Sequence, residues 1–486
     1  MTEASTDLSW LRGSSVLVTG ARISGLAVVR PLLDLGALVT VTDSNRAALD
    51  EASALGASVV VQDGLLADSD AIAAFALVVT SPGFRPDSPV LAAAADHDVP
   101  VWGDVEFSWH LDRAEVYGPR VRWLVVTGTN GKTTTTSMLA SILDAAGIDS
   151  VACGNIGLPI ADALRGTPHP RVLAVELSSF QLFWAPSVRP AAGVVLNIAE
   201  DHLDWHGGMD GYVQAKARAL SGDVGVVGLD DAVAAGLRAG APAETVVGFR
   251  LDEPAAGELG VRAGMLVDRA FGDDVELLRA DEVEPSGPSG VLDALAAAAL
   301  ARSIGVDAEA VRNGLRTYRV GPHRAAVVRE LGGVTFVDDS KATNPHAARS
   351  SILAHDRVVW IAGGLLKGAL IDDLVVEIAD RLVAAVVLGR DGMQIAEALA
   401  RHAPDVPVVR LPSGDDAGVT HEAEDADAVM RAAVDHAAGF AASGDTVLLA
   451  PAAASLDMFV DYGHRGRSFA ESVERLDIAA LGSSRS

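Results

Sequence analysis

The chain has 486 residues, a length that suggests about three domains at roughly 150 residues each. Apolar residues make up 49% of it, which excludes a disordered chain, and its net charge of −27 argues against a nucleic-acid-binding surface. The same charge leaves room for a phosphorylated small molecule, because a local basic or glycine-rich pocket can override the overall field.

The cysteine content and the N-terminal segment indicate the cellular compartment in which we expect the protein. Cys153 is the only cysteine, so no disulfide can form within the chain and no cysteine-based zinc site is possible. Segment 1–7 lacks the basic and apolar regions of a signal peptide, and no run of about 20 apolar residues is free of charge. We therefore expect a cytoplasmic protein without a membrane segment.

Three successive blocks alternate short β-branched runs with helical stretches, the pattern of βαβ units on a parallel sheet. Strands are expected at 15–20, 38–42, 77–80, 123–128, 172–176, 193–197, 334–338, 358–362, 385–388 and 446–450. Residues 240–290 are rich in glycine, proline and acids and predict a loop-rich excursion, and 413–427 predict a solvated surface loop.

Polar turns near residues 118 and 320 separate the blocks and give the expected domain boundaries. The sequence predicts an α/β protein of three domains: a Rossmann-like domain over 1–117, a central phosphate-loop ATPase-type domain with a parallel sheet over 118–320, and a second Rossmann-like domain over 321–486.

A phosphate-binding loop is the strongest local signal. It runs from Gly128 to Thr133, follows an apolar strand and precedes a helical stretch at 137–146. Glycines let backbone N–H groups approach phosphates, and the helix N-terminus adds its positive end. Lys132 would contact the terminal phosphates, and the Thr133 hydroxyl would be a Mg²⁺ ligand. Val126 replaces the first glycine of the common eight-residue pattern, so the loop has a shorter form.

Two further expected strands end in polar segments, where open α/β sheets usually bind ligands. One segment begins at Glu176, and the other contains His202 and His206. The two histidines are four residues apart, as in a zinc pair, but Leu203 replaces the glutamate of the zinc-protease pattern, which disfavours zinc hydrolysis. We favour a surface or capping role for His206, and spacing alone leaves Glu176 open as a plain charged residue after a strand.

These motifs together resemble the Mur ligase family, the ATP-dependent ligases of peptidoglycan precursor synthesis. The resemblance covers essentially the whole chain, through segments 128–133, 176–182, 197–204, 321–324 and 338–345 in the same order. Segments 178–181, 339–344 and 455–459 are most similar to members that add D-glutamate.

The resemblance implies that the chain joins D-glutamate to UDP-N-acetylmuramoyl-L-alanine through an acyl phosphate, using ATP and two Mg²⁺ ions, as a cytoplasmic monomer with no nucleic-acid or membrane partner. It assigns catalysis to Lys132, Glu176, His202 and Lys216, and metal binding to Thr133, Glu176, His202 and Lys216. Carbamylation would turn the cationic end of Lys216 into a carboxylate suited to a metal.

The resemblance also assigns the three substrates to segments along the chain. It implies ATP contacts for Gly128, Thr129, Asn130, Gly131, Lys132, Thr133, Thr134, Asp293, Arg324 and Asp339. The UDP-sugar would contact Ile23, Ser24, Asp43, Ser44, Ser81, Asn155, Ser178 and Gln181. D-Glutamate would contact Lys341, Thr343, Lys367, Ser455 and Tyr462.

The chain departs from the family pattern at several of these positions. Arg22 stands where a middle glycine is usual, Asn45 where an arginine often follows, Asp293 where an asparagine is frequent and Tyr462 where a phenylalanine is common. Three alternatives remain: a sister or folate-type ligase with another amino acid, a nicotinamide oxidoreductase suggested by Asp43 downstream of the first glycine loop, and an ATP-binding regulatory module without catalysis.

Overall fold

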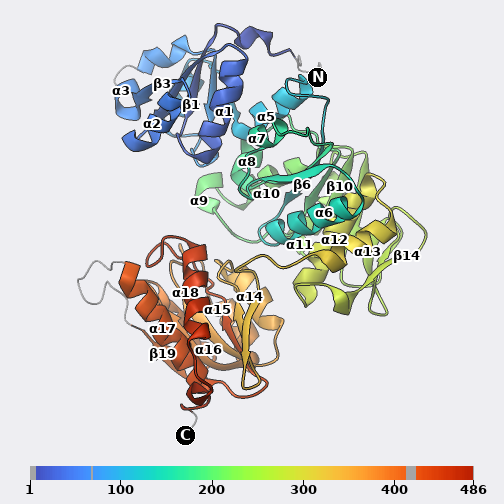
Figure 1. Ribbon diagram of the computed structural model, residues 1–486, viewed down its shortest axis with the longest axis vertical. Coiled ribbons are helices and arrows are strands. Elements are labelled where there is room, and N and C mark those ends of the chain that lie inside the picture. The colour runs from blue at the N-terminus through green and yellow to red at the C-terminus, as the bar shows by residue number, and fades with distance from the viewer. Residues whose placement is uncertain (1–6, 67–68, 412–422, 485–486) are drawn as a thin grey trace. The chain divides into compact units, whose positions relative to one another are not determined.

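The computed structural model describes residues 7–66, 69–411 and 423–484. The described residues form three sheets, of five, nine and six strands. By their contacts they fall into two units, Met1–Val283 with Val291–Tyr318 and Glu284–Gly290 with Arg319–Ser486 (Figure 1). The first unit holds two of the sheets and the second holds the third. The finer boundary at 117 stays a prediction.

The N-terminal sheet is parallel, with the strand order β3-β2-β1-β4-β5. Its strands are β1 Ser15–Thr19, β2 Leu38–Asp43, β3 Ser58–Val61, β4 Leu77–Thr80 and β5 Val101–Gly103. Its helices are α1 Ile23–Asp34, α2 Arg46–Ala54, α3 Gln62–Leu66, α4 Pro89–Asp96 and α5 Asp104–Arg113. Alternate strand residues face opposite sides: Val16 and Val18 belong to the core that contains Val28 of α1, and Leu17 to the core that contains Val90 of α4.

The central sheet has the strand order β14-β13-β12-β11-β10-β9-β6-β8-β7. Its strands are β6 Arg122–Thr127, β7 Ser150–Gly154, β8 Val172–Glu176, β9 Ala192–Val195, β10 Val224–Gly228, β11 Thr245–Phe249, β12 Glu258–Arg262, β13 Met265–Asp268 and β14 Val275–Arg279. The helices of this region are α6 Lys132–Ala145, α7 Ile160–Leu164, α8 Ser179–Phe183, α9 Leu203–His206, α10 Met209–Ala217, α11 Ala232–Gly236, α12 Pro288–Ser303 and α13 Ala308–Thr317.

The expectation of a loop-rich excursion over 240–290 is wrong. Strands β11 to β14 lie in this segment and extend the central sheet, first parallel and then antiparallel. The glycines and acids that suggested loops lie largely in the tight connections, such as the turn at Ala263 and Gly264, where both residues have positive φ. Strands of four or five residues between such turns give too short a hydrophobic pattern to stand out in the sequence.

The C-terminal sheet has the strand order β15-β16-β20-β17-β18-β19, and β15 is its antiparallel strand. Its strands are β15 Ala326–Leu331, β16 Val334–Asp338, β17 Val358–Gly363, β18 Leu382–Leu388, β19 Val408–Arg410 and β20 Thr446–Leu449. Its helices are α14 Pro345–Leu353, α15 Asp372–Ile378, α16 Gly392–His402, α17 Ala423–Phe440 and α18 Tyr462–Glu474.

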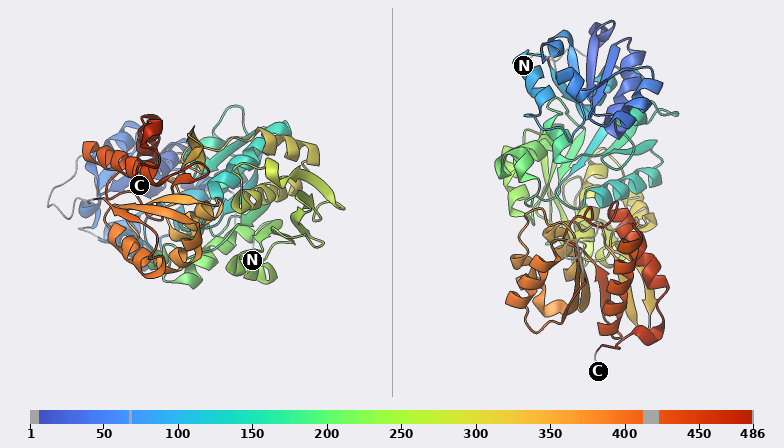
Figure 2. Two further views of the ribbon diagram at one scale, coloured as in Figure 1. Left: turned by 90° about the horizontal axis from the view of Figure 1, so that it is seen from below. Right: turned by 90° about the vertical axis from the view of Figure 1, so that its left-hand side faces the viewer.

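Helices cover both faces of this sheet. Trp360 and Leu448 belong to the core under α14, α15 and α16, whereas Phe336 and Leu449 belong to the core under α17 and α18. The last two helices lie side by side (Figure 2). The expected surface loop at 413–427 lies outside the described residues up to 422, and from Ala423 onward it is wrong because α17 begins there.

The polar segments singled out in the sequence follow the carboxyl ends of parallel strands. The loops after β1, β6, β8 and β9 do so in the first unit, and those after β16, β17 and β20 in the second. Such ends are where open α/β sheets usually bind ligands. Among the described helices, none combines the length and apolar character that a membrane span requires.

Candidate functional site

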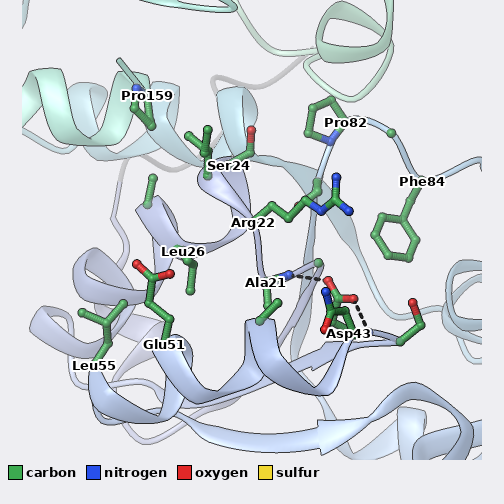
Figure 3. A pocket seen from close by; sticks show the side chains of 18 of the residues that line it. Ala21, Arg22, Ser24, Leu26, Asp43, Glu51, Leu55, Pro82, Phe84 and Pro159 are labelled. Atoms are coloured by element: carbon green, nitrogen blue, oxygen red, sulfur yellow. Dashed lines mark hydrogen bonds between the residues drawn. The ribbon is translucent and has the colours of Figure 1, made fainter. Parts of the chain in front are cut away.

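A cavity of about 1280 Å³ opens at the carboxyl end of the N-terminal sheet (Figure 3). Its walls come from the loops after β1, β2 and β4, from helices α1 and α2, and from the α7 region of the central sheet. It contains five of the residues expected to contact the UDP-sugar: Ile23, Ser24, Asp43, Ser44 and Ser81. Asn155, Ser178 and Gln181, the other three, are not among its lining residues. Its volume exceeds that of a typical small-ligand pocket and suits a ligand as large as a nucleotide sugar.

The loop after β1 is held by tight backbone packing and by one carboxylate. Gly20 has φ +92°, and a Cβ on Gly25 would lie 1.8 Å from the Gly20 carbonyl oxygen, so helix α1 can start this close to β1 only with glycine there. Asp43 accepts hydrogen bonds from the backbone N–H of Ala21 and of Asn45, both at 2.8 Å. Asp43 therefore links the loops after β1 and β2 at the cavity floor.

The phosphate loop joins β6 to α6 and is braced by the segment after β9. Gly131 has φ +84° and precedes Lys132, the first residue of α6. Asn197 accepts from the N–H of Asn130 at 2.9 Å and donates to its carbonyl oxygen at 3.2 Å. The Thr129 hydroxyl lies 2.9 Å from the Tyr212 hydroxyl. The loop is thus preformed, with its backbone conformation fixed by neighbours outside the motif.

Two lysines converge on one carbonyl of this loop. Lys132 Nζ donates to the oxygens of Gly128 at 3.0 Å and Thr129 at 2.8 Å, and Lys216 Nζ donates to the same Gly128 oxygen at 2.7 Å. Lys216 is only 2% exposed, and its Nζ lies 4.6 Å from the centroid of the Tyr212 ring. Burial, and then the neighbouring charge of Lys132, hold the pKa of the Lys216 amine well below its usual range.

Glu176, the last residue of β8, carries a buried oxygen with no partner. Its Oε1 accepts from Asn155 Nδ2 at 2.8 Å, whereas its Oε2 has no hydrogen-bond partner among the described residues, although the side chain is 2% exposed. An acceptor-only carboxylate in this state is suited to a cation. Asn155, expected at the UDP-sugar, here orients Glu176. Within the described ranges, no three His, Cys, Asp or Glu side chains gather as a metal site.

The histidines lie in an aromatic cluster beside α8. His202 has φ +53°, and its ring centroid lies 4.7 Å from that of Phe180. His206 is half-buried, stacks on Phe180 and has Nε2 2.9 Å from the Ser179 hydroxyl. Burial, with the charges of Lys216 and His202, lowers the pKa of His206 to about 4. This packed, neutral side chain differs from the surface or capping role that the sequence favoured.

Gln181 caps helix α8 and lies near a buried carboxyl that the sequence analysis did not single out. Its Oε1 accepts from the Ser178 N–H at 3.0 Å, which closes a capping box at the start of α8. Asp104, the first residue of α5, lies near Gln181 and Ser24, whose side chains partly offset the burial that raises its pKa to about 6. A lone acidic residue at a helix start is common in sequences, so no signal marked Asp104.

Asp293 lies against the phosphate loop. A Cβ added to Gly131 would lie 2.3 Å from Asp293 Oδ1, and that oxygen accepts from the Thr135 hydroxyl at 2.9 Å. The residue expected at the adenine is therefore in contact with the loop and with the first turns of α6.

In the second unit, the residues expected to bind D-glutamate follow β16, β17 and β20. Lys341 Nζ lies 4.0 Å from the centroid of the Tyr462 ring, a cation–π contact that requires the aromatic ring of this position. Ser455 is buried in the loop after β20, and Lys367, after β17, has φ +53°. Asp339 accepts from the Ala325 N–H at 3.2 Å, and burial raises its pKa to about 6.

Arg465 of α18 ties these loops together and was not found from the sequence. It is 1% exposed and donates to the Ser340 hydroxyl at 3.0 Å and the Ser340 carbonyl at 2.8 Å. It also donates to the carbonyls of Ala453 at 3.1 Å and Gly363 at 3.3 Å. The sequence of this helix does not predict that Arg465 is buried, because its acceptors lie in the loop after β16, at the end of β17 and in the loop after β20.

Comparison with known proteins gives three family models in order along the chain. They are the MurD-like N-terminal domain of Mur ligases over 14–103, the Mur ligase middle domain over 126–300 and the Mur ligase glutamate ligase domain over 323–453. A Rhodococcus jostii protein named UDP-N-acetylmuramoylalanine–D-glutamate ligase is 66% identical and covers 99% of each chain. The chain belongs to the Mur ligase family.

Other relatives agree with this Mur ligase assignment. A Nocardia farcinica protein of the same name is 63% identical, with 98% of this chain and 99% of the relative covered. The solved structure of a UDP-N-acetylmuramate-alanine ligase from Thermotoga maritima has a TM-score of 0.59 at 19% identity, covering 95% and 99% of the two chains, and shows the common fold. The first glycine loop therefore belongs to a Mur ligase N-terminal domain, and the oxidoreductase alternative is discarded.

Proposed function

We propose that this Mur ligase joins D-glutamate to UDP-N-acetylmuramoyl-L-alanine in peptidoglycan precursor synthesis, forming an amide bond with consumption of ATP. The observation that carries the proposal is the 66% identity, over 99% of both chains, to a relative named for that reaction. The match of 323–453 to a glutamate ligase domain supports the amino-acid assignment.

In the proposed reaction, an oxygen of the alanyl carboxylate attacks the γ-phosphorus of ATP, giving an acyl phosphate and ADP. The D-glutamate amine then attacks the acyl carbon and loses a proton, and the tetrahedral intermediate expels inorganic phosphate as the amide forms. The contribution of the chain is positioning and charge neutralisation. Lys132, at the start of α6, is placed to exchange its two backbone acceptors for phosphate oxygens, with the loop N–H groups beside it.

We infer Mg²⁺ binding, with two ions, at Thr133, Glu176, His202 and Lys216. The partnerless Oε2 of Glu176 and the half-buried Thr133 at the start of α6 are hard oxygen donors of the kind Mg²⁺ prefers. When bound, Mg²⁺ neutralises the charge that develops on the transferred phosphoryl group. Glu176 is held for this role by Asn155, which fixes one carboxylate oxygen and leaves the other free.

We further propose that Lys216 is carbamylated. Burial and the charge of Lys132 favour loss of the ammonium proton of Lys216; the deprotonated amine would attack CO₂, and loss of one further proton leaves a carbamate whose negative charge is attracted to Lys132. Incubation with ¹³C-bicarbonate should give a carbamate NMR signal that disappears in Lys216→Ala and persists in a control, Lys367→Ala. A signal unchanged by Lys216→Ala would contradict the assignment.

The substrate assignments of the sequence analysis remain our proposals, as do the domain boundaries at 117 and 320. The UDP-sugar is placed in the cavity of the first unit, ATP at the phosphate loop, and D-glutamate at the cluster around Lys341 and Tyr462. We also propose a cytoplasmic monomer, for which light scattering should give a mass close to 50.0 kDa.

The test of the function is phosphate release with UDP-N-acetylmuramoyl-L-alanine, ATP and a panel of D- and L-amino acids. We expect release with D-glutamate and little with L-alanine or diamino acids. Folylpolyglutamate-type activity is tested in the same assay with folate as the acceptor. Activity with L-alanine or a diamino acid and none with D-glutamate would overturn the amino-acid assignment and favour a sister ligase.

A further inference from the structure

The cavity at the N-terminal sheet is lined by four arginines, and one of them differs from the rest. Arg30 pairs with Asp34 at 3.0 Å, Arg85 with Asp87 at 3.0 Å and Arg165 with Asp162 at 3.4 Å. Arg22 lines the same cavity, but it forms no ion pair with any carboxylate in the described part of the chain. Its guanidinium is the cation of this cavity that is available to a ligand.

Arg22 occupies the middle position of a loop whose two outer glycines have packing roles. A Cβ on Gly20 would lie 2.5 Å from Ser81 Oγ, and one on Gly25 would lie 1.8 Å from the Gly20 carbonyl oxygen. The middle glycine of such loops has a different purpose, since it lets the backbone approach a diphosphate closely. In this chain that position carries a side chain, so the fold keeps the glycines needed for packing and gives up the one needed for close approach.

We propose that Arg22 binds the diphosphate of the nucleotide-sugar substrate and replaces the close backbone contact of the three-glycine loop. The proposal rests on the function proposed above and adds to it a diphosphate-binding side chain. A guanidinium presents a planar fork of donors that matches two phosphate oxygens, which a backbone N–H cannot do.

The geometry around Arg22 supports this assignment. Arg22 has φ −102° and ψ −169°, an extended conformation that costs an arginine nothing, and its side chain is exposed to the cavity. Figure 3 shows it reaching from the start of α1 across the cavity toward Pro82 and Phe84. The opposite wall is held in place, because Trp184 Nε1 donates to the Phe84 carbonyl at 3.2 Å. A ligand between Arg22 and this wall would meet one cation without an ion-pair partner and a surface fixed by hydrogen bonding.

The negative net charge of the chain increases the need for a local cation such as Arg22 in this cavity. With a net charge of −27, the protein repels a diphosphate at long range, and three of the cavity's four arginines are already neutralised by carboxylates. An unpaired guanidinium supplies the local attraction that the overall field lacks.

The test measures binding of UDP, UMP and uridine to the full chain by calorimetry, for the wild type and for Arg22→Ala, Arg22→Gly and Arg22→Lys. Loss of a charge-assisted contact should weaken UDP binding of Arg22→Ala by roughly tenfold or more and leave uridine binding unchanged. Arg22→Gly should recover part of the loss, because the backbone can again approach the diphosphate. Arg22→Lys should lie between Ala and wild type, since a point charge lacks the fork.

A matched control is Arg12→Ala, an exposed arginine that precedes β1 and lies outside the cavity lining. Its UDP affinity should equal that of the wild type. Wild-type UDP affinity in Arg22→Ala, or an equal loss for uridine and UDP, would overturn the proposal. These results would leave the proposed function intact if the wild-type enzyme turns over UDP-N-acetylmuramoyl-L-alanine. If the wild-type enzyme does not turn over this substrate, the proposed function itself is refuted.

Discussion

Replacing Arg465 by methionine tests whether one buried side chain organises the proposed D-glutamate site. Methionine keeps an unbranched apolar stem and removes the guanidinium. The substitution leaves the carbonyls of Ser340, Gly363 and Ala453 without their donor, in a region from which water is excluded. These carbonyls belong to the loop after β16, the end of β17 and the loop after β20, so their common partner fixes these three segments relative to one another.

The size of the effect follows from two opposing contributions. Each buried acceptor left without a partner costs about 1–3 kcal/mol, so three carbonyls set an upper limit of roughly 9 kcal/mol. Burying a cation has its own cost, shown by the pKa of Arg465, which burial lowers to about 10, and methionine removes that cost. We therefore expect a net loss of about 3–5 kcal/mol, below that upper limit because the cost of burying the cation is removed.

Differential scanning calorimetry and steady-state kinetics measure the two consequences. One thermal transition should fall by roughly 10 °C, and the KM for D-glutamate should rise more than tenfold with little change in the KM for ATP. Arg475→Met is the control: Arg475 is exposed beyond the end of the same helix, so its loss should change stability by less than about 0.5 kcal/mol. A loss below about 1 kcal/mol in Arg465→Met would refute the reasoning.

Three further predictions concern the first unit. Lys132→Ala should abolish phosphate release without changing the melting temperature. Phosphate release by this variant at the wild-type rate would contradict the role of Lys132. Burial raises the pKa of Asp104 to about 6, so its native state binds the proton more tightly than the unfolded chain and wild-type stability falls as the pH rises from about 4 to 6. In urea unfolding, Asp104→Asn should be more stable than the wild type by on the order of 2 kcal/mol at pH 8 and as stable as the wild type below pH 4. The same stability difference at both pH values would contradict this prediction. Burial raises the pKa of the Cys153 thiol, so a thiol reagent should modify it only after denaturation, and fast native labelling would disagree.

The elements found from the sequence are those whose local pattern matches their final environment. The buried parallel strands β1, β6 and β17 are continuous apolar runs, and the loops after them carry recognisable polar residues. Strands β11 to β14 were missed because each is short and the turns between them are rich in glycine and acids.

The contacts that shape the site were harder to predict, for a physical reason. Asn155 was expected at the substrate, and its hydrogen bond to Glu176 depends on β7 and β8 being neighbours in the sheet. The burial of Arg465 and Asp104 depends in the same way on packing between segments far apart in the chain. A sequence pattern indicates whether a segment is buried or exposed. The partners of a side chain depend instead on which distant segments the fold brings next to it.

The groups left without partners at the carboxyl ends of the first unit's strands share a consistent logic. Oε2 of Glu176 is an acceptor that suits a cation, and Arg22 is a donor that suits an anion. Burying the partnerless oxygen of Glu176 costs stability, which a bound cation would offset, whereas Arg22 is exposed to the cavity and costs nothing before a ligand binds. In a chain of net charge −27, local groups such as Arg22 and a cation held at Glu176 would supply the attraction for anionic ligands that the overall charge lacks.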